Sequence, residues 1–377
     1  MGDKQPKFEE TTSMANQNDA VLEALSLAVA VRVPVLLWGP PGTGKSSAVA
    51  AMCEAVGLPY EVVIASIREP SDFSGLPVVS EEQVEFAPPR WAKRLSDAGG
   101  GLLFLDEIST APPAVQAALL RVVLERVVGD LSLPEELSIV AAANPPDQAA
   151  DGWDLSSPLA NRFCHLDWSV DPVGVATGLM AGFPSPRVPN LPGGWEKQIP
   201  SGAALVGGFL AVRPSLAIQP PTERALAGKA WPSPRTWEML SKLLAAAQVI
   251  DASPEIIRNL VIGCVGEGAG IEFLTWLQEL DLPDPEIALR DPDGVVFPDR
   301  GDRLYAALSA VAGAVAADPT PERWLAGWRV LAVATTQAPD VGAMAARVLA
   351  QIRPEGVSAP PEAAAFLPVL KAAGLVE

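Results

Sequence analysis

No part of this 377-residue chain limits its possible folds more than the octapeptide Gly39–Ser46, whose sequence GPPGTGKS fits the pattern G-x-x-x-x-G-K-S. It follows a short apolar run, Val33–Trp38, and precedes an alanine-rich segment, Ser46–Val56, that is predicted to be helical. The glycines let the backbone turn its N–H groups inward, and the dipole of the following helix favours an anion between them. The sequence therefore predicts a phosphate cradle between a strand and a helix. An ordinary glycine turn is the poorer interpretation, because every fixed position of the pattern is filled.

Strands and helices are expected to alternate through the first half of the chain. Apolar runs predict five strands, at 33–38, 60–65, 101–105, 138–142 and 163–167. Helices are predicted at 21–31, 46–56 and 112–128. Near-continuous apolar strands separated by helices are typical of a parallel sheet that is covered on both faces. We therefore expect an α/β fold for this half and, after residue 171, helices separated by links rich in proline and glycine.

Two carboxylates, Asp106 and Glu107, end the strand at 101–105. Ligands of parallel sheets bind at the carboxyl ends of the strands. We expect Asp106 to hold Mg²⁺ through water, Ser46 to ligate it, and Glu107 to polarise an attacking water. Lys45 is expected to reach the β- and γ-phosphates. A helix-capping acid pair is the alternative, and the position of the pair downstream of Lys45 argues against it. The expected nucleotide contacts are Gly39, Pro40, Pro41, Gly42, Thr43, Gly44, Lys45, Ser46, Ser47, Asp106 and Arg235.

Three further polar residues have two open interpretations each. Asn144 follows the fourth strand, where its amide can orient water beside the γ-phosphate or simply form the turn before two prolines. Arg162 precedes the fifth strand and can reach the γ-phosphate of a neighbouring subunit or form an intramolecular salt bridge. Arg235 opens a later helix, where it can fold onto the nucleotide of its own chain or pack against Trp231 or Trp237.

The charge balance restricts the partners of the chain. It has 27 Lys and Arg against 45 Asp and Glu, a formal net charge of −18. Such an acid excess argues against sequence-independent binding to nucleic acid phosphates or anionic lipid, although one local basic groove remains compatible with it. About half of the residues are apolar, enough to bury sizeable cores, and the length predicts two or three domains.

Cysteine and histidine usage excludes several kinds of site. Cys53, Cys164 and Cys264 are too few and too scattered for a disulfide framework or a zinc site, and they indicate buried thiols in a reducing cytoplasm. A single histidine, His165, argues against histidine-based metal or triad chemistry. Residues 1–18 are polar and are expected to form a flexible leader. No run reaches the roughly 20 apolar residues of a membrane span, so we expect a soluble, cytoplasmic protein.

In this order, these residues resemble the motifs of AAA+ ATPases, and within that group those of the MoxR family, over about residues 19–283. The matches are Gly39–Ser46 to Walker A, Leu102–Glu107 to Walker B, Asn144 to sensor 1, Arg162 to the trans arginine finger and Arg235 to sensor 2. Leu119–Val128 resembles the helix after Walker B, and Asp171–Gly174, Phe209–Pro214 and Ala230–Trp237 resemble the lid of MoxR-like ATPases found beside von Willebrand A-domain proteins. The segment Val127–Leu137 is shorter than the hairpin that the family often has there.

The resemblance implies a P-loop AAA+ core with a five-stranded parallel sheet over 19–170 and an all-α lid over 171–283. A turn-rich linker and a helical C-terminal extension are expected over 284–377, and the resemblance gives the tail at 304–377 no role. It also implies a homo-oligomeric ring, typically a hexamer, with ATP and Mg²⁺ bound between subunits. The implied role is chaperone-like or metal-insertion-like, with a von Willebrand A-domain partner.

Two loops are expected to line the pore of such a ring, Arg68–Gly75 and Phe86–Arg94. In the second, Trp91 lies among Arg90, Lys93 and Arg94 and can grip a polypeptide or stack on single-stranded nucleic acid. Packing of Trp91 in the core is slightly favoured, and Arg90 and Arg94 are second candidates for the trans cation. The leading hypothesis is an ATP-hydrolysing ring that remodels a protein partner. The alternatives are a nucleic-acid motor, which the acid excess disfavours, and a nucleotide-gated scaffold, which Glu107 disfavours.

Overall fold

The structure is a computed structural model that describes residues 9–80, 83–145, 153–183, 186–223, 226–279, 282–298, 300–335, 339–372 and 374–375. The chain divides into two compact units. The first comprises Met1–Asn190, Gln219–Met239 and Ile250–Gly270, and the second comprises Leu191–Ile218, Leu240–Val249 and Ile271–Glu377. The segment 171–283, expected as a lid, contributes to both units.

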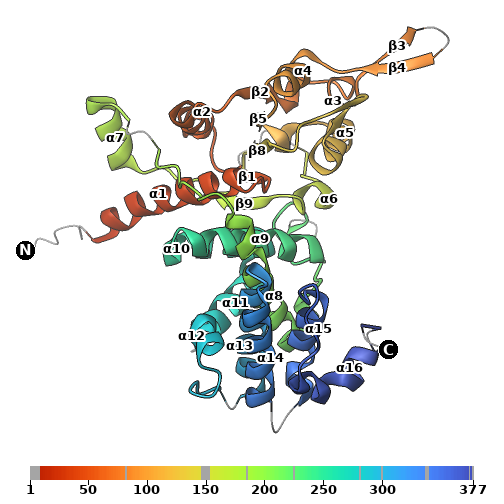
Figure 1. The fold of residues 1–377 in the computed structure, drawn as a ribbon. Helices are drawn as coiled ribbons and strands as arrows, with labels where there is room; N and C mark the ends of the chain where they lie inside the picture. The colour runs from red at the N-terminus through yellow and green to blue at the C-terminus, as the bar shows by residue number, and fades with distance from the viewer. Residues whose placement is uncertain are drawn as a thin grey trace, which may run out of the picture. The chain divides into compact units, whose positions relative to one another are not determined.

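A five-stranded parallel sheet forms the centre of the first unit (Figure 1). Its strand order is β2-β5-β8-β1-β9. The strands are β1 (Val35–Trp38), β2 (Tyr60–Ile64), β5 (Gly101–Asp106), β8 (Leu137–Ala143) and β9 (Cys164–Asp167). Every residue of β1 and β8 is buried, as the apolar runs predicted. The expected α/β class with a five-stranded parallel sheet is confirmed, and β8 separates the strands that carry the two phosphate-site motifs.

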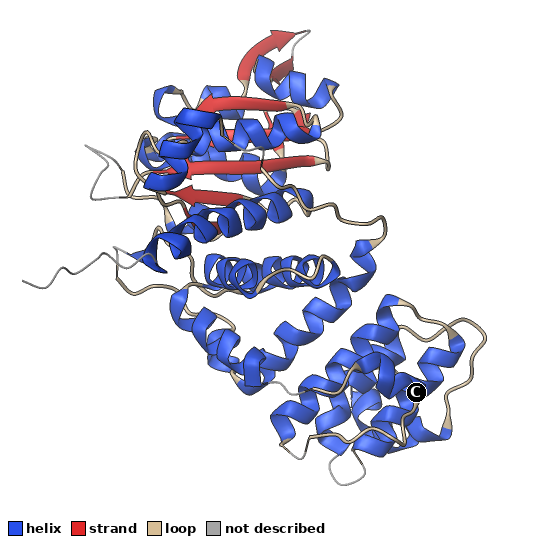
Figure 2. Ribbon diagram, turned by 90° about the vertical axis from the view of Figure 1, so that its left-hand side faces the viewer, coloured by secondary structure: helices blue, strands red, loops and turns tan. Residues whose placement is uncertain are grey.

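Helices cover this sheet (Figure 2). The described α-helices of the first unit are α1 (Glu9–Ala30), α2 (Lys45–Val56), α3 (Ser71–Ser74), α4 (Arg90–Asp97), α5 (Pro113–Glu125), α6 (Ser157–Ala160), α7 (Pro172–Ala181) and α10 (Pro254–Val265), with the first residues of α9 (Pro234–Val249) and α11 (Glu267–Glu279). α1 and α10 pack together and against β9, while α4 packs on β2. The core joins one face of the strands, for example Leu105 and Ile139, to Trp91 of α4 and Leu119 of α5.

Two predictions for the first unit are corrected. Residues 9–18 belong to α1, so the helix expected from 21 begins at Glu9 and only residues 1–8 of the expected leader lie outside the described residues. Phe86–Arg94 is not a loop, because Phe86 lies in strand β4 (Gln83–Ala87) and α4 begins at Arg90. Proline at the first turn of α5 fits the expected helix start.

Two small hairpins extend the first unit. β3 (Leu76–Ser80) pairs antiparallel with β4, and β6 (Val127–Val128) pairs with β7 (Leu131–Ser132). The first hairpin was not predicted. The second lies within the segment Val127–Leu137, which was expected to be short.

The second unit is helical over its described residues. It contains η3 (Trp195–Gln198), α8 (Ile199–Val212), η4 (Pro214–Leu216), the remaining parts of α9 and α11, α12 (Pro285–Arg290), α13 (Gly301–Ala317), α14 (Pro321–Ala334), η6 (Pro339–Gly342), α15 (Ala343–Gln351), η7 (Pro361–Phe366) and α16 (Leu367–Ala372). Trp324 and Trp328 are buried against each other, and Trp328 contacts Phe366. The expected helical tail is therefore a packed body, and α12 lies in the stretch expected as a turn-rich linker.

Candidate active site

The phosphate-binding loop lies between the end of β1 and the start of α2. Gly42 and Gly44 have φ angles of 74° and 88°, in the left-handed region that a residue with a Cβ rarely adopts. Gly44 is the N-cap of α2, and no side chain caps the helix there. The first turn of α2 also lacks acidic residues, so its free N–H groups and positive dipole end suit an anion.

Lys45 lies in this loop with its ammonium group on backbone carbonyls. Its Nζ donates to the carbonyl oxygens of Gly39 at 2.6 Å and Pro40 at 2.9 Å. The residue is only 7% exposed. Burial lowers the pKa of Lys45, and the negative charge of Asp106 opposes that shift. Further negative charge would stabilise the charged form of this buried ammonium, and a bound phosphate supplies such charge.

Ser46 and Asp106 meet across the sheet. The Ser46 hydroxyl donates to Asp106 Oδ2 at 2.9 Å, and the Glu107 amide donates to Asp106 Oδ1 at 2.9 Å. A hydroxyl and a carboxylate are oxygen ligands that suit Mg²⁺, so this pair fits the expected ion. Within the described ranges, no group of three His, Cys, Asp or Glu side chains could hold a metal. A magnesium ion here would therefore complete its shell with phosphate oxygens and water.

Glu107 follows β5 in a strained conformation. Its φ is 55°, in the left-handed region, which costs a non-glycine residue about 1–2 kcal/mol. Its carboxylate accepts a hydrogen bond from the hydroxyl of Ser66, in the short helix η1 (Ala65–Ile67) after β2. The two residues meet because β2 and β5 are paired with Ile64 opposite Asp106. Sequence reasoning missed Ser66, since no motif includes it.

Asn144 lies between the two motifs, as the position of β8 requires. Its Oδ1 is 3.4 Å from Lys45 Nζ. Its backbone N–H donates to the hydroxyl of Ser109, in η2 (Ile108–Thr110), at 3.2 Å. The sheet thus brings Lys45, Asn144 and the Asp106–Glu107 pair to one edge. A turn before the prolines explains neither the direction of the Asn144 side chain nor its approach to Lys45.

Arg162 and Arg235 lie near each other within the first unit. The pKa of Arg162 is lowered by burial and by the positive charge of Arg235. Arg162 donates to the carbonyl oxygen of Pro158, and its buried Nε has no partner among the described residues. The neighbouring Asn161 fixes the start of α9 by donating to the Trp231 carbonyl at 3.0 Å. In the part of the chain that is described, neither arginine has a carboxylate partner, so the salt bridge considered for Arg162 is not formed.

The second candidates for a trans cation, Arg90 and Arg94, differ. Arg94 forms an ion pair with Glu61. In the other expected pore loop, Arg68 lies 4.0 Å from Asp72. Trp91 is 6% exposed and packs against Phe73, which confirms the interpretation favoured for it. Arg90 forms no ion pair with the described residues.

Comparison with known proteins identifies the unit that carries this site. The family model described as AAA domain (dynein-related subfamily) matches residues 34–163. Residues 34–163 are an AAA domain. Its limits run from the residue before β1 to the residue before β9, so they enclose Lys45, Asp106, Glu107, Asn144 and Arg162. AAA domains are in general ATPase domains, and the α/β fold with its helical extension agrees with this assignment.

Similarity to individual known proteins covers only part of this chain. The Psp operon transcriptional activator of Escherichia coli is 34% identical over 139 residues, covering 34% of this chain and 42% of the relative. The human ATPase family gene 2 protein homolog B is 33% identical over 130 residues, covering 32% of this chain and 16% of the relative. The chain thus spans less than half the length of these two relatives. A proposed ATPase from Cytophaga hutchinsonii superposes with a TM-score of 0.46 and 16% identity, over 73% of this chain and 94% of that one.

Proposed function

We propose that the chain is a Mg²⁺-dependent ATPase that assembles into a ring and remodels a protein partner. The observation that carries this proposal is the convergence of Lys45, Asn144 and Glu107 at one sheet edge beside the Ser46–Asp106 pair. These are a phosphate-binding cation, a water-orienting amide, a carboxylate base and an oxygen pair that suits Mg²⁺.

Each residue has a defined part in the proposed reaction. The amides of the loop and Lys45 bind the β- and γ-phosphates, since burial lowers the pKa of Lys45 and a bound anion opposes that shift. Ser46 and Asp106 would hold Mg²⁺, which neutralises charge on the phosphate oxygens when bound. Glu107 accepts a proton from the attacking water, and Asn144 orients that water. Ser66 must release Glu107, because its hydroxyl occupies the carboxylate oxygen that faces it.

Arg162 is proposed to act on the nucleotide of a neighbouring subunit. It has no carboxylate partner in the described chain, and its buried Nε is unsatisfied, so it is available for an anion. An arginine finger accelerates phosphoryl transfer by about 10³–10⁵. Arg235 is proposed to contact the nucleotide of its own chain. The hexameric ring, the MoxR-type chaperone-like role, the von Willebrand A-domain partner and a cytoplasmic location are proposed from the resemblance and the free cysteines alone.

The hairpin β3–β4 supports a protein partner over nucleic acid. Its register puts Pro77, Val79, Val84 and Phe86 on one face, and all four are exposed, Val79 by 79%. The stretch 76–87, LPVVSEEQVEFA, has three glutamates and no lysine or arginine. An apolar face without cations suits an apolar polypeptide segment and repels a phosphate backbone. Among the described helices, none is both long and apolar enough to cross a bilayer.

Steady-state phosphate release tests the proposal. Glu107→Gln should keep nucleotide binding and lose turnover by about a hundredfold or more, because the base is removed while the cradle stays intact. Mixing Arg162→Ala with Lys45→Ala subunits should restore part of the activity, since one interface then pairs an intact loop with an intact finger. Unimpaired hydrolysis by Glu107→Gln would overturn the catalytic assignment. If mixing Arg162→Ala and Lys45→Ala subunits restored no ATPase activity, Arg162 would not act on the neighbouring subunit's nucleotide.

A further inference from the structure

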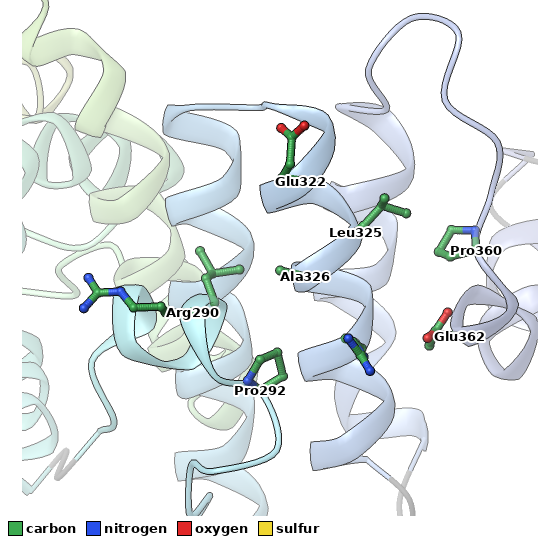
Figure 3. A pocket seen from close by; sticks show the side chains of 9 residues that line it. Arg290, Pro292, Glu322, Leu325, Ala326, Pro360 and Glu362 are labelled. Atoms are coloured by element: carbon green, nitrogen blue, oxygen red, sulfur yellow. The ribbon is translucent and has the colours of Figure 1, made fainter.

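A cavity of about 390 Å³ is lined by residues of the second unit (Figure 3). Its lining comes from three elements: the end of α12 with the residues that follow, one face of α14, and the start of η7. The lining residues are Leu289, Arg290, Pro292, Glu322, Leu325, Ala326, Arg329, Pro360 and Glu362. Its volume is at the lower end of the range of ligand sites, which is room for a few side chains and not for a large cofactor.

α14 contributes an ordered stripe to this cavity. Glu322, Leu325, Ala326 and Arg329 have the spacing i, i+3, i+4, i+7 and therefore share one face of the helix. The two charges are about 10 Å apart along the axis, at 1.5 Å per residue. Leu325 between them is 41% exposed. In Figure 3, Pro292 and Pro360 lie on opposite sides of this stripe.

The charges of the stripe are not used by the fold. The next residue of α14, Arg323, is bidentate on Glu286 with both distances 2.7 Å, and it donates to the Ala314 carbonyl at 2.9 Å. By contrast, the side chains of Glu322 and Arg329 form no hydrogen bond or ion pair with any residue of the described ranges. Arg323 therefore joins α14 to α12. The stripe has an apolar centre, Leu325 and Ala326, between the unpaired and opposite charges of Glu322 and Arg329.

The shape of the walls indicates the kind of ligand. Helical elements form most of them, and helix backbone groups are bonded within the helix, so they offer no edge to an extended peptide. A ligand here must satisfy its own backbone, as an amphipathic helix does when its apolar side chains enter a groove at i, i+3, i+4 and i+7 spacing. Opposite charges at the ends of the stripe would select a helix with a complementary pair.

We propose that this cavity is the docking groove for an amphipathic helix of a partner protein. That helix places a leucine-sized side chain on Leu325 and Ala326, a cation beside Glu322 and a carboxylate beside Arg329. The site is independent of ATP hydrolysis and goes beyond the proposed function of the AAA domain.

The test uses the full-length chain and three fluorescently labelled helical peptides, followed by anisotropy. The first peptide has lysine, leucine and glutamate at the spacing of Glu322, Leu325 and Arg329. The second replaces its leucine with serine, and the third replaces its glutamate with lysine. We expect the first peptide to bind at least tenfold more tightly than the second, because the apolar anchor fills the cavity. Against the third, we expect about a fivefold advantage, the size of one exposed charge pair.

Variants of the chain assign this binding to the groove. Arg329→Glu should reverse the preference, so that the third peptide binds more tightly than the first. Leu325→Asp should abolish binding, while Ile287→Asp, at a site 53% exposed on α12 and outside the cavity, should not. Circular dichroism checks that each variant is folded, and Glu107→Gln should bind as wild type does. Equal affinity for all three peptides, or a Leu325→Asp chain that binds unchanged, overturns the proposal.

Discussion

At the scale of single residues, the contact between Ser66 and Glu107 restrains the proposed base. The Ser66 hydroxyl must leave the carboxylate oxygen before that oxygen can accept a proton from water, and breaking this hydrogen bond adds to the barrier. We expect Ser66→Ala to raise kcat for ATP about two- to tenfold, the worth of one hydrogen bond, with KM nearly unchanged. Ser66→Thr, which keeps the hydroxyl, is the matched control. A loss of kcat as large as that of Glu107→Gln would instead make Ser66 a residue that positions the base for catalysis.

His165 links the pH dependence of stability to the end of β1. Its Nδ1 accepts from Trp38 Nε1 at 2.9 Å and its Nε2 donates to the Ala160 carbonyl at 2.9 Å, so the ring is neutral. Burial lowers the pKa of His165 to about 4, below the unfolded value near 6.5. The unfolded state therefore binds the extra proton, and stability falls as pH drops from about 6.5 to 4, by up to about 3 kcal/mol. Urea unfolding across this range should show the loss in wild type and a smaller one in His165→Gln. If the free energy of unfolding fell equally with pH in wild type and in His165→Gln, the assignment to His165 would be wrong.

Sequence reasoning could find the residues that a contiguous pattern fixes. Lys45 and Ser46 were predicted because the loop spacing defines their roles, and Asp106 because it ends a buried strand. Ser66 could not be found this way, since it meets Glu107 only through the register of β2 on β5. The proximity of Arg235 to Arg162 likewise arises from segments more than seventy residues apart.

At the scale of elements, the turn of the hairpin β6–β7 is joined to the base of the hairpin β3–β4. Asp130 N–H donates to the Phe86 carbonyl at 3.0 Å, and Asp130 Oδ2 accepts from Phe86 N–H at 2.7 Å. Gly75 and Gly129 cross so closely that a Cβ on Gly75 would lie 2.7 Å from the Gly129 Cα. The sequence did not predict β3–β4, because the stretch 76–87 has none of the glycine or asparagine that marks a tight hairpin.

Gly129→Ala tests this junction. The φ of Gly129 is 61° and an added Cβ would strike the Phe86 carbonyl oxygen, so we expect a loss of about 2–4 kcal/mol in the free energy of unfolding. Gly57→Ala is the matched control, since Gly57 has a similar φ of 65° with open space around its Cβ. It should lose only about 1 kcal/mol. Denaturant melts of the two variants measure both, and equal losses would show that the junction tolerates a methyl group.

At the scale of the whole molecule, the proposed ring makes activity depend on protein concentration. A subunit that needs Arg162 from its neighbour is nearly inactive alone, so ATPase activity per subunit should rise steeply with concentration and then level off. Phosphate release measured from nanomolar to micromolar protein, alongside sedimentation, checks this. Arg162→Ala should stay low and flat although it still assembles. Constant specific activity in a chain that remains monomeric would refute the assembly.

The crossing of Gly75 and Gly129 also has a consequence for how related chains can diverge. Neither position can gain a side chain unless the other hairpin moves, and both residues have a positive φ. A second substitution would not relieve the first, so we expect both positions to stay glycine. The arms of β3–β4 beyond the crossing are under less constraint, because the side chains of their apolar face are exposed. We therefore expect relatives to keep the junction while the length and side chains of the arms change with the partner.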